Sequence, residues 1–153
     1  MSLKIIKGDL FEQNVDCYVN AWNMNFIPWF MLLPHGVSGK LKKVAGYTPF
    51  NELLMKGIIK PGRAVMTNGG RLNKPVIHVA GLTWYWIANL EIVEKCTRNA
   101  LLLAKGKNIK SIAFPLIGAG VGGLKKEEVL LVMKQVAEEK EWNIDIIFVE
   151  YAK

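Results

Sequence analysis

The stretch IKSIAFPLIGAGVGGLKKEEVLLVMKQVAEEKEWNIDIIFVE, residues 109–150, decides the fold class. Residues 109–114 are a compact apolar run that predicts a buried strand, and 144–150 predict another. Between them, Val129, Met133 and Val136 recur at helical spacing within residues 125–139. Strand, helix and strand in this order are typical of a βαβ unit, which indicates an α/β fold.

The rest of the chain repeats this alternation of strands and helices. β-rich segments ending at Gly8 and spanning 15–21, 63–67 and 75–80 predict further strands, and helices are expected at 36–46 and 88–104. Ser38 is available to cap the first of these helices. We therefore expect one α/β domain over residues 1–153, in which helices cover both faces of the sheet. Ligands in such sheets bind at the carboxyl ends of the strands.

Composition excludes several classes of protein. About half of the 153 residues are apolar, which argues against disorder, and no apolar run is long enough to span a bilayer. The N-terminus lacks a signal-peptide layout, so we expect a soluble cytoplasmic protein without membrane contact. Cys17 and Cys96 lie in apolar segments and are expected to be buried thiols, with neither a metal nor a cofactor. The formal charge of +7 favours polyanionic ligands, although scattered lysines are also typical of a solvated surface.

The glycines of residues 118–123 satisfy the dinucleotide pattern G-x-G-x-x-G, but their context argues against a Rossmann site. Residues 115–117 separate the strand from Gly118, whereas the dinucleotide turn leaves the strand at once. Glu150 comes 27 positions after Gly123, where ~20 is usual. No Gly-Lys-Ser/Thr follows, which excludes a P-loop. The remaining interpretations are a backbone cradle for a phosphate, or glycines that only allow close packing or a loose loop.

A second group of polar residues lies near the N-terminus. Asp9 follows a strand that ends at Gly8, and it could cap a turn or accept a hydrogen bond from an exocyclic amine. Asn20 and Asn23 end a buried strand. Because buried amides need partners, they either tie neighbouring loops together or present polar groups to a ligand.

Six motifs in order resemble the landmarks of the macrodomain family: GDL at 8–10, VNAWN at 19–23, GVSGKLKKVAG at 36–46, GRAVMTNGGRL at 62–72, VIHVAG at 76–81 and SIAFPLIGAGVGG at 111–123. The resemblance implies a three-layer α/β/α fold with a mixed sheet and a cleft for ADP-ribose. It implies that Asp9 binds the adenine amine beside the backbone of Leu10, and that Asn23 faces the distal ribose. The remaining residues that it places in the site are Asn20, Gly36, Val37, Ser38, Gly118, Ala119, Gly120, Val121, Gly122 and Gly123.

The chain departs from the family pattern in its first binding loop. The family usually has Gly-Gly-Gly-Val-Asp-Gly there, whereas this chain has LPHGVSG at 33–39, with Ser38 at the acidic position. A serine cannot activate water without a neighbouring base, and His35 is the replacement base that the sequence offers. Gly122 replaces an aromatic residue common in the family. The apolar insertion at 26–33 could pack against the core, form a lid over the distal ribose or form a partner-binding patch. The aromatic run at 83–86 could stack on adenine or ribose, or plug the cleft.

Three functions follow from these observations. The first is binding of ADP-ribose or a derivative through the glycine loop. The second is hydrolysis of an ADP-ribosyl or O-acetyl-ADP-ribose ester, with Asn23 and His35 as the catalytic residues. The third is binding of RNA or poly(ADP-ribose) through a basic surface; nucleic acid is the less favoured partner, since charge alone does not select it.

Overall fold

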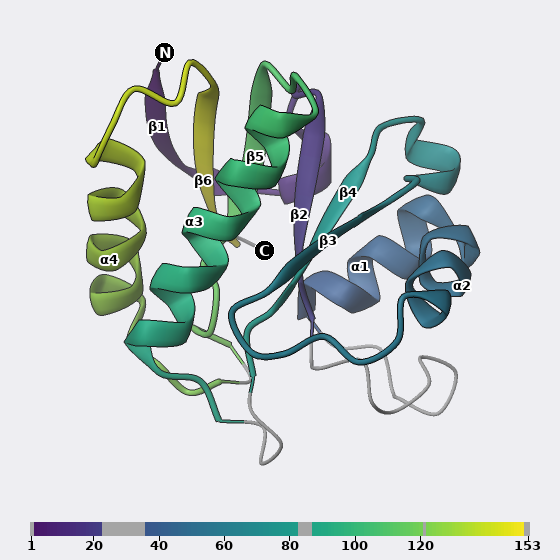
Figure 1. Cartoon of the computed structure of the whole chain (residues 1–153), viewed down its shortest axis with the longest axis horizontal. Coiled ribbons are helices and arrows are strands. Elements are labelled where there is room, and N and C mark those ends of the chain that lie inside the picture. Colours follow the sequence, from purple (N-terminus) through teal and green to yellow (C-terminus); the bar gives the residue numbers. More distant parts are fainter. Residues whose placement is uncertain (1, 23–35, 83–86, 121, 152–153) are drawn as a thin grey trace.

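A computed structural model of the chain describes residues 2–22, 36–82, 87–120 and 122–151. Six strands form one mixed sheet in the order β1-β6-β5-β2-β4-β3, and β3 alone among them runs antiparallel to its neighbour (Figure 1). The bounds are β1 Leu3–Gly8, β2 Cys17–Trp22, β3 Ala64–Thr67, β4 Val76–Ala80, β5 Ser111–Pro115 and β6 Asp145–Tyr151.

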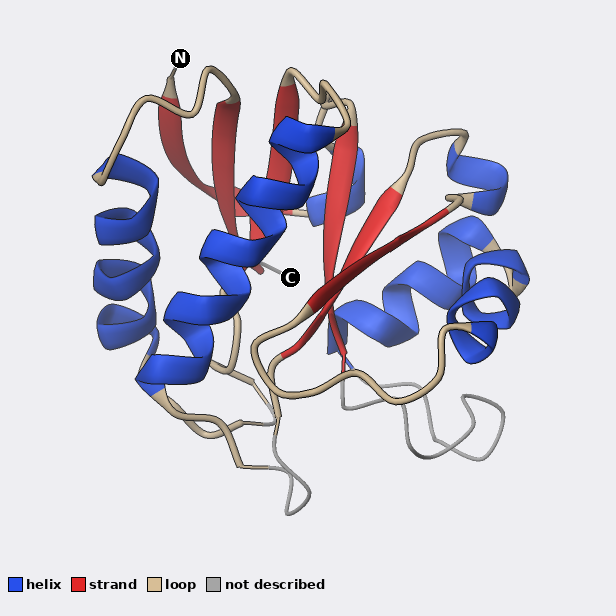
Figure 2. Ribbon diagram, viewed as in Figure 1, coloured by secondary structure: helices blue, strands red, loops and turns tan. Residues whose placement is uncertain are grey.

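Helices cover both faces of this sheet, as expected (Figure 2). Helices α3 (Leu90–Gly106) and α4 (Lys126–Glu138) pack on one face, and α1 (Gly36–Ala45) and α2 (Thr48–Met55) pack on the other. Short 3-10 turns, η1 (Leu10–Glu12) and η3 (Gly70–Leu72), complete the second face. The prediction of a three-layer α/β/α fold with a mixed sheet is confirmed.

The βαβ unit predicted from residues 109–150 is present. Strands β5 and β6 are parallel neighbours with Ser111 opposite Asp145, and α4 connects them. The rings of Phe114 and Phe148 meet edge to face, with centroids 5.7 Å apart. Because such a crossover buries both strands, their sequences are almost continuously apolar.

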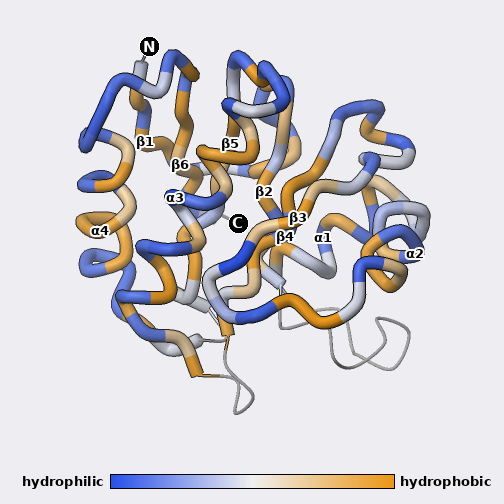
Figure 3. Tube along the Cα trace, in the orientation of Figure 1, coloured by the Kyte–Doolittle hydropathy of each residue, from blue (hydrophilic) through white to orange (hydrophobic). Residues whose placement is uncertain are grey.

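Each face of the sheet has its own hydrophobic core. The core under α3 and α4 includes Trp142, whose indole donates to the carbonyl of Val136, and both free cysteines are buried, as predicted. The core under α1 and α2 is built around Phe50 and Leu41. In Figure 3 the central strands are mainly coloured as apolar, whereas apolar and hydrophilic residues alternate along the helices. No helix in the described part of the chain is long and apolar enough to cross a membrane.

Two local features differ from the sequence interpretation. Helix α2 was not predicted: it has eight residues and begins with Pro49 in its first turn, so its apolar pattern is too short to stand out. Ser38 does not cap α1, because it lies within the helix and its hydroxyl bonds to strand β2 instead.

Candidate functional site

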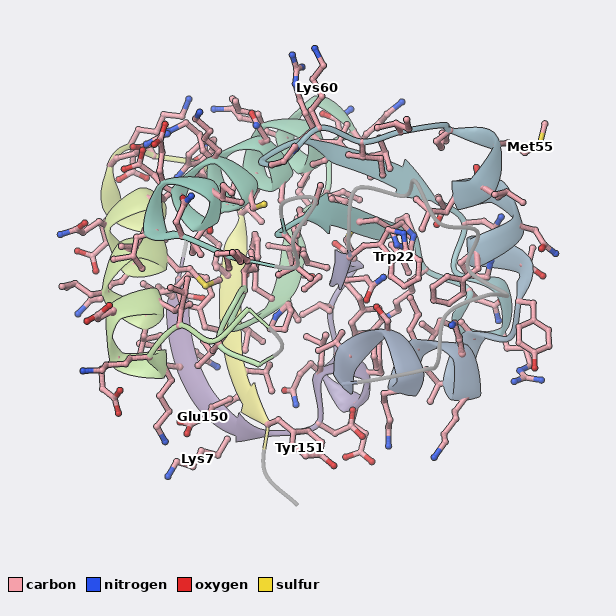
Figure 4. The ribbon with its side chains drawn as sticks, turned by 90° about the horizontal axis from the view of Figure 1, so that it is seen from below. Lys7, Trp22, Met55, Lys60, Glu150 and Tyr151 are labelled. Atoms are coloured by element: carbon pink, nitrogen blue, oxygen red, sulfur yellow. The ribbon has the colours of Figure 1, made fainter. Side chains whose placement is uncertain are left out.

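The candidate site lies at the edge where the parallel strands β1, β6, β5, β2 and β4 have their carboxyl ends. Figure 4 shows the molecule from this side, with Trp22 at the end of β2 and Tyr151 at the end of β6. The parallel register brings the ends of strands that are distant in sequence to one edge; Gly8 of β1, for example, lies opposite Tyr151. This edge therefore holds Asp9, which follows β1, and the glycine loop, which follows β5. Ser38 lies there too, since it bonds to β2.

Asp9 is fixed by two interactions directly after β1. One carboxylate oxygen accepts from the backbone N–H of Phe11 at 2.9 Å, which caps η1, and the other lies 2.9 Å from the ammonium of Lys40 on α1. This carboxylate holds the pKa of Lys40 above its usual value. Leu10, the other residue expected here, is buried. Tyr151 is 71% exposed at the neighbouring strand end, where it lies opposite Gly8, the residue before Asp9.

Asn20 is completely buried and lies at the centre of a polar chain that crosses the sheet. Its side-chain oxygen accepts from the Ser38 hydroxyl at 2.9 Å, and its amide nitrogen donates to Nδ1 of His78 at 3.0 Å. Nε2 of His78 in turn lies 2.8 Å from the hydroxyl of Thr67, which donates to the carbonyl of Asn68. Each member of the chain thus has a partner, as buried polar groups require.

The directions of these hydrogen bonds show which ring nitrogen of His78 carries the proton. Since Nδ1 accepts from an amide, the ring proton lies on Nε2 and is donated to Thr67. Complete burial lowers the pKa of His78 to about 3, so the imidazole is neutral at physiological pH. His78 is therefore structural. Asn20 ties β2 to α1 and β4; its direct contact with a ligand stays a prediction.

The glycine loop after β5 divides into two kinds of glycine. A Cβ at Gly122 would lie 2.5 Å from Cβ of Ala88 and 2.7 Å from the carbonyl oxygen of Gly118, so this position leaves no room for a side chain. Gly118 has a φ of 82° and packs similarly against Ala88. In contrast, no described residue comes within 4 Å of a Cβ at Gly120 or Gly123. The packing glycines shape the loop, whereas the open ones have room beside their backbone. Of these two, the N–H of Gly123 donates to the carbonyl of Gly120 at 3.1 Å, so the backbone of Gly120 is the part that a ligand can approach.

The loop leads directly into helix α4. Its N-cap residue, Lys125, makes no side-chain capping bond, so this side chain provides no acceptor for the first N–H groups of the helix. Lys126 pairs instead with Glu150 on β6, at 2.6 Å. Exposed backbone of Gly120 in a loop that leads into a helix start is the local geometry that favours an anion.

Several predicted site residues cannot be placed. Asn23, His35, Val121, the insertion at 26–33 and the aromatic run at 83–86 lie outside the described residues. The first turn of α1 is formed by Gly36, Val37 and Ser38. This helix lies on the face of the sheet opposite to α4, the helix that follows the glycine loop. No three His, Cys, Asp or Glu side chains gather as metal ligands anywhere in the described ranges.

The sequence and the fold of this chain are similar to those of known proteins. The Macro domain family model matches residues 19–133. The chain belongs to the macrodomain family. It is 34% identical over 133 residues to an O-acetyl-ADP-ribose deacetylase of Salmonella newport, covering 82% of this chain and 72% of that protein. It is 36% identical over 151 residues to a macro domain-containing protein of Listeria monocytogenes, covering 92% of this chain and 83% of that protein.

Solved macrodomains have the same architecture. A mutant of the Oceanobacillus iheyensis macrodomain with ADPR matches with a TM-score of 0.82 and 26% identity, over 97% of this chain and 84% of that one. The Trypanosoma brucei macrodomain in complex with ADP-ribose matches with a TM-score of 0.80 at 22% identity, over 99% of this chain and 64% of that one; this likeness concerns the fold alone.

Two residues at the macrodomain site were missed by sequence reasoning. Lys40 reaches Asp9 from a helix 31 positions further along the chain, and Tyr151 lies beside Asp9 because β1 and β6 are paired. Lys40 lies within the motif at 36–46 but was given no role there, and Tyr151 belongs to no quoted motif. The sequence offered two weak signals for them: Lys40 lies one helical turn after Val37, and the last predicted strand ends next to an aromatic residue, Tyr151.

Proposed function

We propose that this macrodomain binds ADP-ribose. The observation that carries the proposal is the pairing of two groups at one edge of the sheet: a fixed carboxylate, Asp9, and the exposed backbone of Gly120 in the loop that leads into α4. A nucleoside diphosphate presents the complementary groups, an exocyclic amine at one end and two phosphates in the middle. Relatives named for O-acetyl-ADP-ribose and for ADPR support this choice of nucleotide.

The proposed roles follow from chemistry at each position. The carboxylate of Asp9 accepts from the adenine amine, next to Leu10, while the exposed ring of Tyr151 offers a flat apolar surface to the base. The N–H groups of Ala119 and Gly123 donate to carbonyls of the loop itself, so the other backbone N–H groups of residues 118–123 bind the diphosphate, and the positive end of α4 adds to the attraction. Gly36 and Val37 approach from α1, and Asn23 faces the distal ribose.

Isothermal titration with ADP-ribose tests the proposal. Gly120→Ala places a methyl group where the structure has open space, so it leaves folding intact but obstructs a phosphate that approaches the backbone. We expect at least a tenfold loss of affinity. Gly106→Ala is the matched control, because a Cβ there also meets nothing within 4 Å and the position lies at the far end of α3. Absence of binding by the unmodified protein at millimolar ADP-ribose would refute the proposal.

A second proposal is hydrolysis of an ADP-ribosyl or O-acetyl-ADP-ribose ester, and the identity to an O-acetyl-ADP-ribose deacetylase favours it. Water adds to the ester carbonyl, and the products are acetate and ADP-ribose. Ser38 stands where the family has an acid, and its one proton is directed at the oxygens of Asn20 and Ala21. Because no described side chain bonds to this hydroxyl as a base, we assign water activation to His35, with Asn23 orienting the water.

Release of acetate from O-acetyl-ADP-ribose is the assay. We expect His35→Ala to lose more than 100-fold in kcat while ADP-ribose affinity is retained. Unchanged kcat in this variant would remove the histidine from the mechanism. Ser38→Asp is expected to increase kcat, since it restores a carboxylate near the reacting water.

A further inference from the structure

A groove lies along β3, the strand at one edge of the sheet, between α2 and α3 (Figure 1). Its volume is about 580 Å³. Residues 64–68 form its floor, and the ends of the two helices flank it with Glu52, Lys56, Leu103 and Lys107. The groove therefore exposes the edge of the sheet to a ligand between two helical walls.

This groove is distinct from the candidate site. The site lies at the carboxyl ends of the parallel strands, where Asp9 follows β1 and the glycine loop follows β5. Strands β2 and β4 lie between β5 and β3 in the sheet. Because β3 is antiparallel to β4, its last residue, Thr67, lies opposite Val76, the first residue of β4. The groove thus extends toward the amino ends of the parallel strands.

The backbone of β3 presents hydrogen-bonding groups to the groove. The N–H of Ala80 donates to the carbonyl of Arg63, so Arg63 faces β4. Bonding directions alternate along an antiparallel strand, and therefore Ala64 and Met66 direct their N–H and C=O groups away from β4. In the described part of the chain, no strand pairs with this outer side of β3.

Glu52 already bonds to one end of this outer edge. Its carboxylate accepts from the backbone N–H and the side-chain amide of Asn68, at 2.7 and 2.8 Å. Asn68 follows the same alternation as Ala64 and Met66, so its bond supports the outward direction of all three. The groups of Ala64 and Met66, about 7 Å apart along the strand, are left for another backbone.

Lysines flank the edge on both faces of the sheet. Lys56 lies on the α2 side and Lys107 on the α3 side, and both are exposed. Among the described residues of the lining, Glu52 is the one carboxylate, and Asn68 engages it. Leu103 adds an apolar contact on the α3 side. Since successive side chains of a strand point to opposite faces, the groove is complementary to an extended segment with alternating acidic and apolar residues.

A second copy of this chain is a poor occupant of the groove. Two β3 edges paired about a two-fold axis would bring Lys56 and Lys107 of both copies to one interface, and each copy carries a formal charge of +7. Like charges across paired strands are destabilising, and lysines beside an edge strand disfavour such self-pairing. An acidic partner reverses this effect.

We propose that β3 binds an extended acidic segment of another protein, which adds to the sheet as one more strand. The backbone of the segment pairs with the outward groups of Ala64 and Met66, as in β-strand addition. Its acidic side chains pair with Lys56, while side chains on the other face contact Leu103. The site does not depend on the proposed binding of ADP-ribose.

Fluorescence anisotropy with a labelled, end-blocked peptide, Thr-Glu-Val-Glu-Val-Glu-Thr, tests the proposal. We expect saturable binding, and we expect Lys56→Glu with Lys107→Glu to weaken it about tenfold, because attraction becomes repulsion on both faces. Lys4→Glu with Lys7→Glu is the matched control, since it makes the same change of charge on β1, at the opposite edge of the sheet. Exposed charges so far away are screened, so we expect affinity within about twofold of wild type.

Two measurements test the backbone pairing. Ala64→Pro removes one outward N–H at the first residue of an edge strand, a position that tolerates proline. We expect it to weaken peptide binding about fivefold while the circular dichroism spectrum is unchanged. A peptide methylated on all its amide nitrogens keeps its carboxylates but cannot donate to β3, so it tests the same pairing without any change to the protein. We expect it to bind about tenfold more weakly.

Five outcomes would overturn the proposal. Absence of binding at millimolar peptide would remove the site, and equal losses in the two double variants would mean that only overall charge attracts the peptide. Equal affinity for the methylated peptide would exclude strand addition. Displacement of the peptide by saturating ADP-ribose would place it in the cleft. A dimer in sedimentation velocity that Ala64→Pro dissociates would identify a second copy as the occupant.

Discussion

Asn20 joins three elements of the macrodomain, so its replacement by alanine tests whether the buried polar chain supports the site. The variant loses two hydrogen bonds: the one from Ser38 at 2.9 Å and the one to Nδ1 of His78 at 3.0 Å. The Ser38 hydroxyl retains an acceptor, because the carbonyl of Ala21 lies 3.2 Å away. Nδ1 of His78, which is fully buried, is left without its donor.

The cost follows from these two contacts. An unsatisfied buried acceptor costs about 1–3 kcal/mol, and the net loss of the Ser38 bond adds about 0.5–1.5 kcal/mol less what the Ala21 carbonyl recovers. We expect Asn20→Ala to lower the free energy of unfolding by about 3 kcal/mol. For a chain of 153 residues this corresponds to a fall in Tm of roughly 6–12 °C.

Urea denaturation followed by circular dichroism measures this change. Asn51→Ala is the matched control, since Asn51 is exposed on α2 and the same substitution there is expected to change stability by less than about 0.5 kcal/mol. A loss below 1 kcal/mol in Asn20→Ala would refute the reasoning, because it would mean that the chain of hydrogen bonds is not coupled to folding.

Three further predictions concern the same macrodomain. The pKa of His78 is lowered to about 3, so as the pH falls the unfolded chain takes up a proton on this residue before the folded chain does. The stabilisation from neutral His78 is therefore present above pH 6.5 and is lost as the pH falls toward 3. Between pH 7 and 5 we expect the free energy of unfolding, measured by urea titration, to fall by about 2 kcal/mol more in wild type than in His78→Gln. Gly122→Ala should lower stability by about 1–3 kcal/mol through contact with Ala88 while Gly120→Ala changes it by less than 0.5 kcal/mol, and equal effects by thermal denaturation would contradict the division of the loop. Asp9→Asn keeps an acceptor for the cap but loses its charge, so titration calorimetry should show ADP-ribose affinity about fivefold weaker with nearly unchanged stability; unaltered affinity would exclude Asp9 from the adenine contact.

The sequence by itself determined the elements whose patterns are long. The apolar periodicity of residues 109–150 predicted β5, α4 and β6 because burial against a sheet demands that pattern, and the alternation along the whole chain predicted the layered fold. Helix α2 was not predicted, because a segment of eight residues that includes a proline shows little apolar periodicity. The ordered motifs also indicated the family and the positions of Asp9 and the glycine loop.

Only the tertiary structure decided which partners these residues have. The bond between Ser38 and Asn20, the ion pair between Asp9 and Lys40 and the position of Tyr151 beside Gly8 all join segments that are distant in sequence. The division of the loop into packing and open glycines depends on Ala88, which lies in the segment just before α3. Local periodicity records which face of an element is buried, whereas these contacts depend on how strands and helices meet at one edge of the sheet, which no local pattern records.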